Sequence, residues 1–206
     1  MTCTIDKNTI DKTIEFHGDT CPGLAIGYRA AEVALEKLFS GRSEDEELVC
    51  IVENDACSID GIQVVSGCTI GKGNLIFRDH GKQVYTFILR DGSDAVRISQ
   101  RSEFAMNSAP GASELMKKFF AGKATEEEKA RYHKKRNDMI RQYLTGPAEE
   151  IFEIKHVKPE IPERARLFNS VKCTECGEIV SESRARVKDG KIVCIPCGTE
   201  YRGINR

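Results

Sequence analysis

The sequence predicts an α+β protein in which helices pack on a mostly antiparallel sheet, followed by a small zinc-ribbon module. Two features of its 206 residues predict this class. Over about the first hundred residues, helical periodicity and short apolar runs follow in the order helix, helix, strand, helix and three strands. Near the end, two Cys-x2-Cys pairs are separated by 17 residues, a spacing typical of a structural zinc site.

The elements of the first half follow from the spacing of apolar residues and from the turn residues between them. Apolar residues at helical spacing predict helices over 6–16 and from Pro22 to about Phe39. The next segments are predicted, in chain order, as a strand, a helix and three strands: 47–53, 57–65, 74–77, 84–89 and 95–98. Because turn sequences separate the last three strands, we expect those strands to form an antiparallel meander.

The second half of the core is predicted to be helical before it ends in a strand. Helices are expected over 113–121 and 125–144, and a strand is expected over 151–157. Thr125 and Glu128 form a capping-box pattern at the start of the longer helix. Two prolines, at 159 and 162, then interrupt regular structure. We therefore divide the chain into a core over 1–158, a linker over 159–170 and a zinc ribbon over 171–206.

Composition places the chain among ordinary globular proteins, with 40% hydrophobic and 31% charged residues. A formal net charge of −1 excludes a strong overall attraction to nucleic acid or to an acidic membrane. No apolar run reaches the roughly 18 residues of a membrane span, and the N-terminal residues lack an apolar signal core. We therefore expect a cytoplasmic protein without membrane contact. In that compartment its nine cysteines favour metal ligation or redox chemistry over structural disulfides.

The four cysteines of the ribbon are predicted to bind one structural zinc ion; they are Cys173, Cys176, Cys194 and Cys197. Four thiolates complete a tetrahedral shell, so this zinc stabilises the module and does no chemistry. A module of about 35 residues buries too little surface to fold without such a metal. Basic residues slightly outnumber acidic ones in the ribbon, which leaves contact with nucleic acid, contact with a protein and simple stabilisation as open alternatives.

The core contains a second group of residues with chemical potential. His17, Asp19 and Cys21 lie within five residues of one another, directly before a predicted helix. The positive end of that helix favours the thiolate form of Cys21. Cys57 lies at the start of the next predicted helix, and Cys68 lies in a glycine-rich loop after it. These groups can converge near His17 as metal ligands or as a nucleophile with its base.

Three segments around these residues, Phe16–Arg29, Asp55–Gln63 and Gly67–Asn74, resemble the E-subunit family of formylmethanofuran dehydrogenase. The ribbon is similar to the zinc-finger tail of some members. The resemblance implies an α+β core, a metal-binding active site and a homodimer whose protomers wrap around each other. The family is named for its association with a molybdenum or tungsten enzyme that reduces carbon dioxide to a formyl group, so an oxidoreductase is an implied partner.

Carried over to this chain, the resemblance implies His17, Cys21 and Cys57 as ligands of a second metal, expected to be zinc. Asp19 stands where the family usually has a second histidine, and whether Asp19 or Cys68 binds the metal stays open. For Cys68, a structural role and a redox role are further interpretations. Lys72 is a candidate cofactor contact, because Gly71, Lys72 and Gly73 can hold an anion; a turn with a surface lysine is the alternative.

Other residues of the core have simpler interpretations. Cys50 lies in an apolar strand and is interpreted as a packed residue. Asp55 and Asp60 are interpreted as helix caps, and the basic stretch 131–141 is interpreted as a solvated helix face.

Three classes of function follow from these motifs and stay open. The first is an enzyme, or part of one, in one-carbon or redox chemistry. The second is a metal sensor or regulator whose ribbon binds nucleic acid or a protein. The third is an accessory protein that delivers metal or cofactor to a molybdenum or tungsten enzyme.

Overall fold

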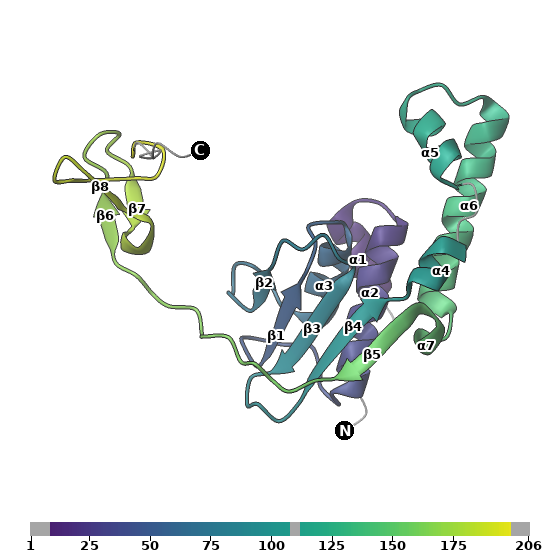
Figure 1. The fold of residues 1–206 in the computed structure, drawn as a ribbon, viewed down its shortest axis with the longest axis horizontal. Coiled ribbons are helices and arrows are strands. Elements are labelled where there is room, and N and C mark those ends of the chain that lie inside the picture. The colour runs from purple at the N-terminus through teal and green to yellow at the C-terminus, as the bar shows by residue number, and fades with distance from the viewer. Residues whose placement is uncertain (1–8, 108–111, 199–206) are drawn as a thin grey trace, which may run out of the picture. The chain divides into compact units, whose positions relative to one another are not determined.

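A computed structural model describes residues 9–107 and 112–198 of the chain, which forms two compact units over 1–164 and 165–206. Figure 1 shows their elements. The first unit contains, in order, α1 (Thr9–His17), α2 (Pro22–Lys37), β1 (Leu48–Val52), α3 (Ser58–Ser66), β2 (Leu75–Phe77), β3 (Val84–Leu89), β4 (Ala95–Gln100), α4 (Ser102–Asn107), α5 (Ala112–Phe120), α6 (Glu126–Thr145), α7 (Ala148–Ile151) and β5 (Phe152–His156). The fold is mixed α and β with a mostly antiparallel sheet, as the sequence predicts.

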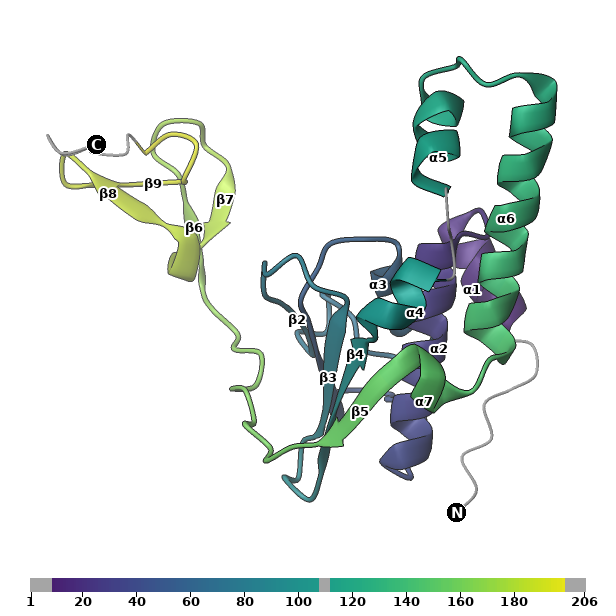
Figure 2. The same ribbon diagram turned by 45° about the vertical axis from the view of Figure 1, so that its right-hand side comes forward.

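The sheet of the first unit has the strand order β2-β1-β3-β4-β5. One face of the sheet is covered by α1, α2 and α3, which Figure 2 shows on the same side of the strands. Side chains alternate along β1: Leu48, Cys50 and Val52 join the main core, whereas Val49 and Ile51 belong to a small cluster on the opposite face. Cys50 is fully buried in this core, which confirms that it is a packed residue.

The predicted meander is wrong in one place. β2 pairs in parallel with β1, with Cys50 opposite Leu75, so β1 separates β2 from β3. A parallel pair needs a crossover connection, and α3 supplies it between β1 and β2. The turn sequence at 80–82 therefore joins strands that are not neighbours. The other part of the prediction is confirmed, because β3 and β4 form an antiparallel hairpin around 91–92.

Helices α2 and α3 come into backbone contact near their N-terminal ends. A Cβ atom at Gly27 would lie 1.8 Å from the Ser58 carbonyl oxygen, and one at Gly61 would lie 2.5 Å from the Tyr28 nitrogen. Only glycine fits at such an approach. The two glycines therefore place the starts of both helices side by side, which brings Cys21 and Cys57 together.

Helices α5 and α6 form a hairpin whose far ends stand clear of the sheet in Figure 1. The predicted capping box opens α6: the Glu128 amide donates to the Thr125 hydroxyl, and the Thr125 amide donates to the Glu128 carboxylate. The last turns of α6 bury Ile140 and Tyr143 in the main core. The first turns of α6 instead contact α5 through Tyr132, which stacks on Phe119.

The second unit consists of two small hairpins. Its elements are β6 (Ser170–Lys172), β7 (Ile179–Ser181), the 3-10 turn η1 (Glu182–Arg184), β8 (Arg186–Lys188) and β9 (Lys191–Val193). Asp189 and Gly190 join β8 to β9 with φ values of 49° and 75°. Positive φ at both central residues is typical of a two-residue hairpin turn, which confirms the turn predicted there.

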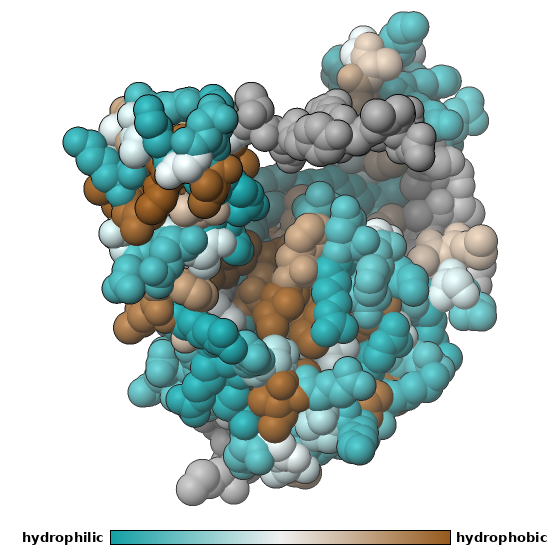
Figure 3. Space-filling model, turned by 60° about the vertical axis from the view of Figure 1, so that its left-hand side comes forward, coloured by the Kyte–Doolittle hydropathy of each residue, from teal (hydrophilic) through white to brown (hydrophobic). Residues whose placement is uncertain are grey.

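On the face shown in Figure 3, hydrophilic residues cover most of the described surface and apolar patches lie between them. Across the described ranges, no helix is long and apolar enough to span a membrane.

Candidate metal centres

The core centre begins at the junction between α1 and α2. His17 is the last residue of α1, and Gly18 turns the chain with a φ of 88°. Cys21 then occupies the N-cap of α2 with an extended backbone, and its sulfur accepts a hydrogen bond of 3.2 Å from the Leu24 amide. An N–H group and the positive end of the helix dipole both stabilise a thiolate at this sulfur.

His17 lies between Cys21 and a carboxylate. Its Nε2 atom is 3.7 Å from the Cys21 sulfur, and its Nδ1 atom is 2.7 Å from Oδ2 of Asp60. A carboxylate accepts from Nδ1–H, which leaves the lone pair of Nε2 directed toward Cys21. Metal-binding histidines are commonly held by a carboxylate in this way. Asp60 was expected to cap a helix, but its carboxylate contacts His17 and the Gln63 amide group instead.

Cys57 is presented by a tight turn between β1 and α3. Oδ1 of the buried Asn54 accepts from the Ala56 amide and the Ser58 hydroxyl, while its amide group donates to the Lys82 carbonyl. The absence of a side chain at Gly23 leaves room for Cys57, because a Cβ atom there would lie 3.1 Å from the Cys57 Cβ. Burial, and then the neighbouring Cys21 thiol, raise the pKa of Cys57. A bound cation would remove that repulsion between thiolates.

His17, Cys21 and Cys57 each offer one ligand atom, and these three atoms lie within 4.8 Å of one another. In a tetrahedral zinc site, the Zn–N and Zn–S bond lengths place neighbouring nitrogen and sulfur ligands about 3.6 Å apart. The His17–Cys21 distance of 3.7 Å fits that geometry. Two thiolates and an imidazole are ligands that zinc prefers, and three protein ligands leave a fourth position open. The donor set therefore suits a zinc ion.

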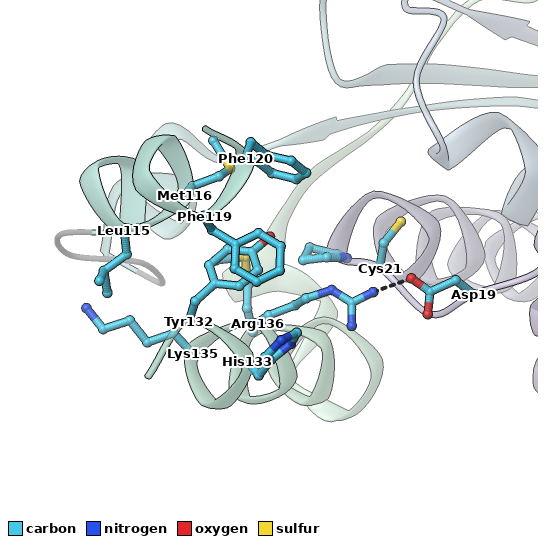
Figure 4. A pocket seen from close by; sticks show the side chains of 12 residues that line it. Asp19, Cys21, Leu115, Met116, Phe119, Phe120, Tyr132, His133, Lys135 and Arg136 are labelled. Atoms are coloured by element: carbon cyan, nitrogen blue, oxygen red, sulfur yellow. Dashed lines mark hydrogen bonds and ion pairs between the residues drawn. The ribbon is translucent and has the colours of Figure 1, made fainter. Parts of the chain in front are cut away.

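Asp19 points away from these three atoms. Its carboxylate, 70% exposed, accepts from Nη2 of Arg136 at 2.6 Å, and Figure 4 shows this ion pair as a dashed line. The Arg136 guanidinium is the main reason that the pKa of Asp19 is lowered. Arg136 also donates to the carbonyl of Thr20. Part of the basic stretch 131–141 thus contacts the loop before Cys21, so this stretch is not purely a solvated helix face.

Cys68 is also remote from the core centre. It follows the C-terminal end of α3, whereas Cys57 precedes the N-terminal end, and the nine-residue helix between them is about 13 Å long. The Cys68 thiol is fully buried, donates to the Leu48 carbonyl, and has its pKa raised to about 11 by burial. This geometry excludes a disulfide between Cys57 and Cys68 in the folded chain.

Lys72 braces the loop that leads into β1. Its ammonium donates to the backbone carbonyls of Ser43 and Glu44 at 3.3 and 3.2 Å. These bonds account for the side chain structurally, and a role of Lys72 in cofactor binding stays a prediction.

A cavity of about 720 Å³ opens beside Cys21, between the α1–α2 junction and the α5–α6 hairpin (Figure 4). Its wall combines aromatic and apolar residues with basic ones: Asp19, Cys21, Pro22, Leu115, Met116, Phe119, Phe120, Tyr132, His133, Lys135, Arg136 and Met139. Sequence reasoning missed this wall, because nothing in the local pattern of α5 or α6 indicates that these helices lie against the Cys21 loop.

The ribbon centre brings together all four predicted cysteines, whose sulfur atoms lie within 4.8 Å of one another. The Cys176 and Cys194 sulfurs are 3.9 Å apart, close to the edge of about 3.8 Å expected for a tetrahedral zinc–sulfur site. Hydrogen bonds from the backbone amides of Cys176 and Cys194 lower the pKa of Cys173 to about 6. This cluster is a structural zinc site.

Comparison with protein families gives two matches. The family model described as FmdE, Molybdenum formylmethanofuran dehydrogenase operon, matches residues 16–153, and the Prokaryotic dksA/traR C4-type zinc finger matches residues 166–202.

A protein of Archaeoglobus fulgidus, described as a "Probable S-adenosyl-L-methionine-binding protein", is 34% identical over 197 residues, which cover 92% of this chain and 52% of that protein. The chain thus spans about half the length of this curated relative. A solved FmdE-like protein of the tungsten formylmethanofuran dehydrogenase type, from Syntrophus aciditrophicus, has the same fold, with a TM-score of 0.59 and 22% identity over 91% of this chain and 89% of that one.

Proposed function

Because the chain belongs to the FmdE family of the molybdenum formylmethanofuran dehydrogenase operon, we propose that its core is a zinc-dependent catalytic unit acting on a small molecule. His17, Cys21 and Cys57 hold the zinc ion in this proposal. The ribbon zinc is structural and takes no part in the chemistry.

One observation carries the proposal: three ligands from two helix starts converge on one point, next to a cavity. Four protein ligands would indicate a closed structural site, whereas three leave a position for water or substrate. Cys21 belongs to the ligand set and also lines the cavity. A volume of about 720 Å³ lies in the range of small-molecule sites. These facts favour an enzyme, or part of one, over a sensor or a metal-delivery protein.

The chain's own residues have separate tasks in this proposal. A zinc ion, when bound, supplies Lewis acidity and an acidified water. Asp60 holds the His17 ring and keeps Nε2 deprotonated toward the ligand position. Asn54 fixes the turn that presents Cys57. The aromatic rings of α5 and α6 exclude water from the cavity beside Cys21.

Zinc content of the purified full-length chain tests the proposal. We expect about two zinc ions per wild-type chain, about one in Cys21→Ser and in Cys176→Ser, and none in the double variant. Cys68→Ser is the matched control: this cysteine lies in neither cluster, and the variant should keep both ions. A folded Cys21→Ser protein that retains two zinc ions would refute the core site.

A further inference from the structure

We propose that the cavity beside Cys21 binds a planar aromatic molecule that carries one anionic group, such as a carboxylate. This inference rests on the proposed function, because it names the class of substrate for the same site. It is drawn from the arrangement of rings and charges around the cavity.

The apolar part of the cavity is a wall of aromatic rings. Phe119 stacks on Tyr132 with a centroid distance of 4.4 Å and an angle of 24°, and Phe120 meets Phe119 edge-on at 5.6 Å. Phe120 is 74% exposed, so no described part of the chain covers it. Flat rings bind such a wall through offset stacking and edge contacts. An aliphatic ligand of the same volume would gain only from burial of its surface.

The charged part of the cavity is Arg136. Its side chain is only 19% exposed and is fixed by Asp19 and the Thr20 carbonyl. Both bonds use Nη2, and no described residue accepts a hydrogen bond from Nε or Nη1. A guanidinium has five donors in a planar fork that matches a carboxylate. Arg136 is therefore held in place and still has donors for an anion.

Charge balance favours a ligand with one negative charge. Lys135 and Arg136 contribute two positive charges to the wall, and Asp19 contributes one negative charge. The net charge of about +1 matches one carboxylate better than a neutral molecule or a multivalent anion.

The position of Arg136 gives the ligand a direction. Figure 4 shows the rings of Phe119 and Tyr132 on one side of the cavity, Cys21 and Asp19 on the other, and Arg136 between them. Arg136 contacts Thr20, the residue before Cys21. The anionic end of the ligand therefore lies beside the proposed zinc, and its aromatic end lies against α5 and α6.

Calorimetry with 2-naphthoate, and with the neutral 2-naphthalenemethanol as its matched probe, tests the inference on the full-length protein. We expect naphthoate to bind at least about tenfold more tightly than the alcohol, since a charged hydrogen bond contributes about 1.5–3 kcal/mol. Phe119→Leu should weaken both probes. Arg136→Gln should weaken naphthoate to the level of the alcohol and leave the alcohol unchanged.

Asp19→Asn separates a binding role of Arg136 from a merely structural one. Removing the carboxylate frees the guanidinium and removes a competing negative charge, so naphthoate should bind several-fold more tightly. If the ion pair only shaped the loop, both variants would weaken both probes. Equal affinity for the two probes in the wild type, or weaker naphthoate binding in Asp19→Asn, would overturn the inference.

Zinc content measured on the same samples keeps this test apart from that of the proposed function. Two zinc ions with no preference for naphthoate would refute the ligand class and leave the zinc site standing. A preference for naphthoate in a protein whose Cys21→Ser variant keeps two zinc ions would refute the zinc site and leave the ligand class standing.

Discussion

Asp60 contacts no proposed metal directly, yet the core site depends on it at the scale of single residues. It holds the Nδ1 atom of His17 at 2.7 Å from a side chain that is only 17% exposed. We predict that Asp60→Asn lowers zinc affinity at the core site by about 10–100-fold, because the ring loses its charged partner. Competition with a chelator, in a variant without the ribbon site, measures this.

Asp55→Asn is the matched control for that prediction. Asp55 lies on the same turn, but its side chain is exposed and outside the ligand group. Its zinc affinity should equal that of the wild type. Equal affinities in Asp60→Asn and Asp55→Asn would show that the His17–Asp60 contact does not support metal binding.

Glu47 gives a pH-dependent prediction. Hydrogen bonds from the Ser43 hydroxyl and the Asp45 amide lower the pKa of its carboxyl to about 2. Because the folded pKa lies below the unfolded value, the stabilisation is present above about pH 4.5 and is lost as the pH falls toward 2. The stability advantage of the wild type over Glu47→Gln should therefore shrink over that range.

Urea denaturation of both proteins at pH 7, 4 and 2.5 measures the advantage. A difference in midpoint that stays constant across the three pH values would rule out this account of Glu47.

Among single residues, those with distinctive chemistry could be predicted and their supporting partners could not. His17, Cys21 and Cys57 lie in short segments whose residue types indicate metal binding. Asp60 lies 43 residues from His17, and an aspartate in the first turn of a helix is just as well explained as a cap. Only the crossing of α2 and α3 shows which interpretation applies.

At the scale of elements, the contact between α2 and α3 positions both halves of the core centre. We predict that Gly27→Ala destabilises the protein by at least about 3 kcal/mol, since its Cβ would lie 1.8 Å from a backbone oxygen of Ser58. The midpoint of urea denaturation measures this loss. Zinc content should fall with it, because the helices must separate.

Gly71→Ala is the control for the helix contact. Nothing lies within 4 Å of a Cβ atom at Gly71, so its stability should change by less than about 0.5 kcal/mol. If Gly27→Ala were as stable as Gly71→Ala, the two helices could not be in backbone contact at Gly27.

Sequence patterns predicted most elements but not all of their pairings. The three-residue strand β2 is too short to reveal its partner, and the turn sequence after it resembles a hairpin. Its parallel pairing with β1 follows from the crossover through α3, which local patterns do not encode. The cavity is harder still, because Arg136 and Asp19 are 117 residues apart in the sequence.

At the scale of the whole molecule, the chain combines two units with different uses of cysteine. The unit over 1–164 has a large apolar core and places His17, Cys21 and Cys57 at its surface. The unit over 165–206 has a small cluster around Cys173, Val193 and Cys194. So small a core depends on its metal for folding, whereas the first unit does not.

This difference makes the core zinc measurable on its own. A full-length Cys176→Ser/Cys197→Ser chain lacks the ribbon site and retains the core ligands. X-ray absorption at the zinc edge then reports the neighbours of the remaining ion. We predict one zinc with two sulfur ligands at about 2.3 Å and nitrogen or oxygen ligands at about 2.0 Å. A folded chain with no zinc, or with a zinc shell that contains no sulfur, would contradict the core site.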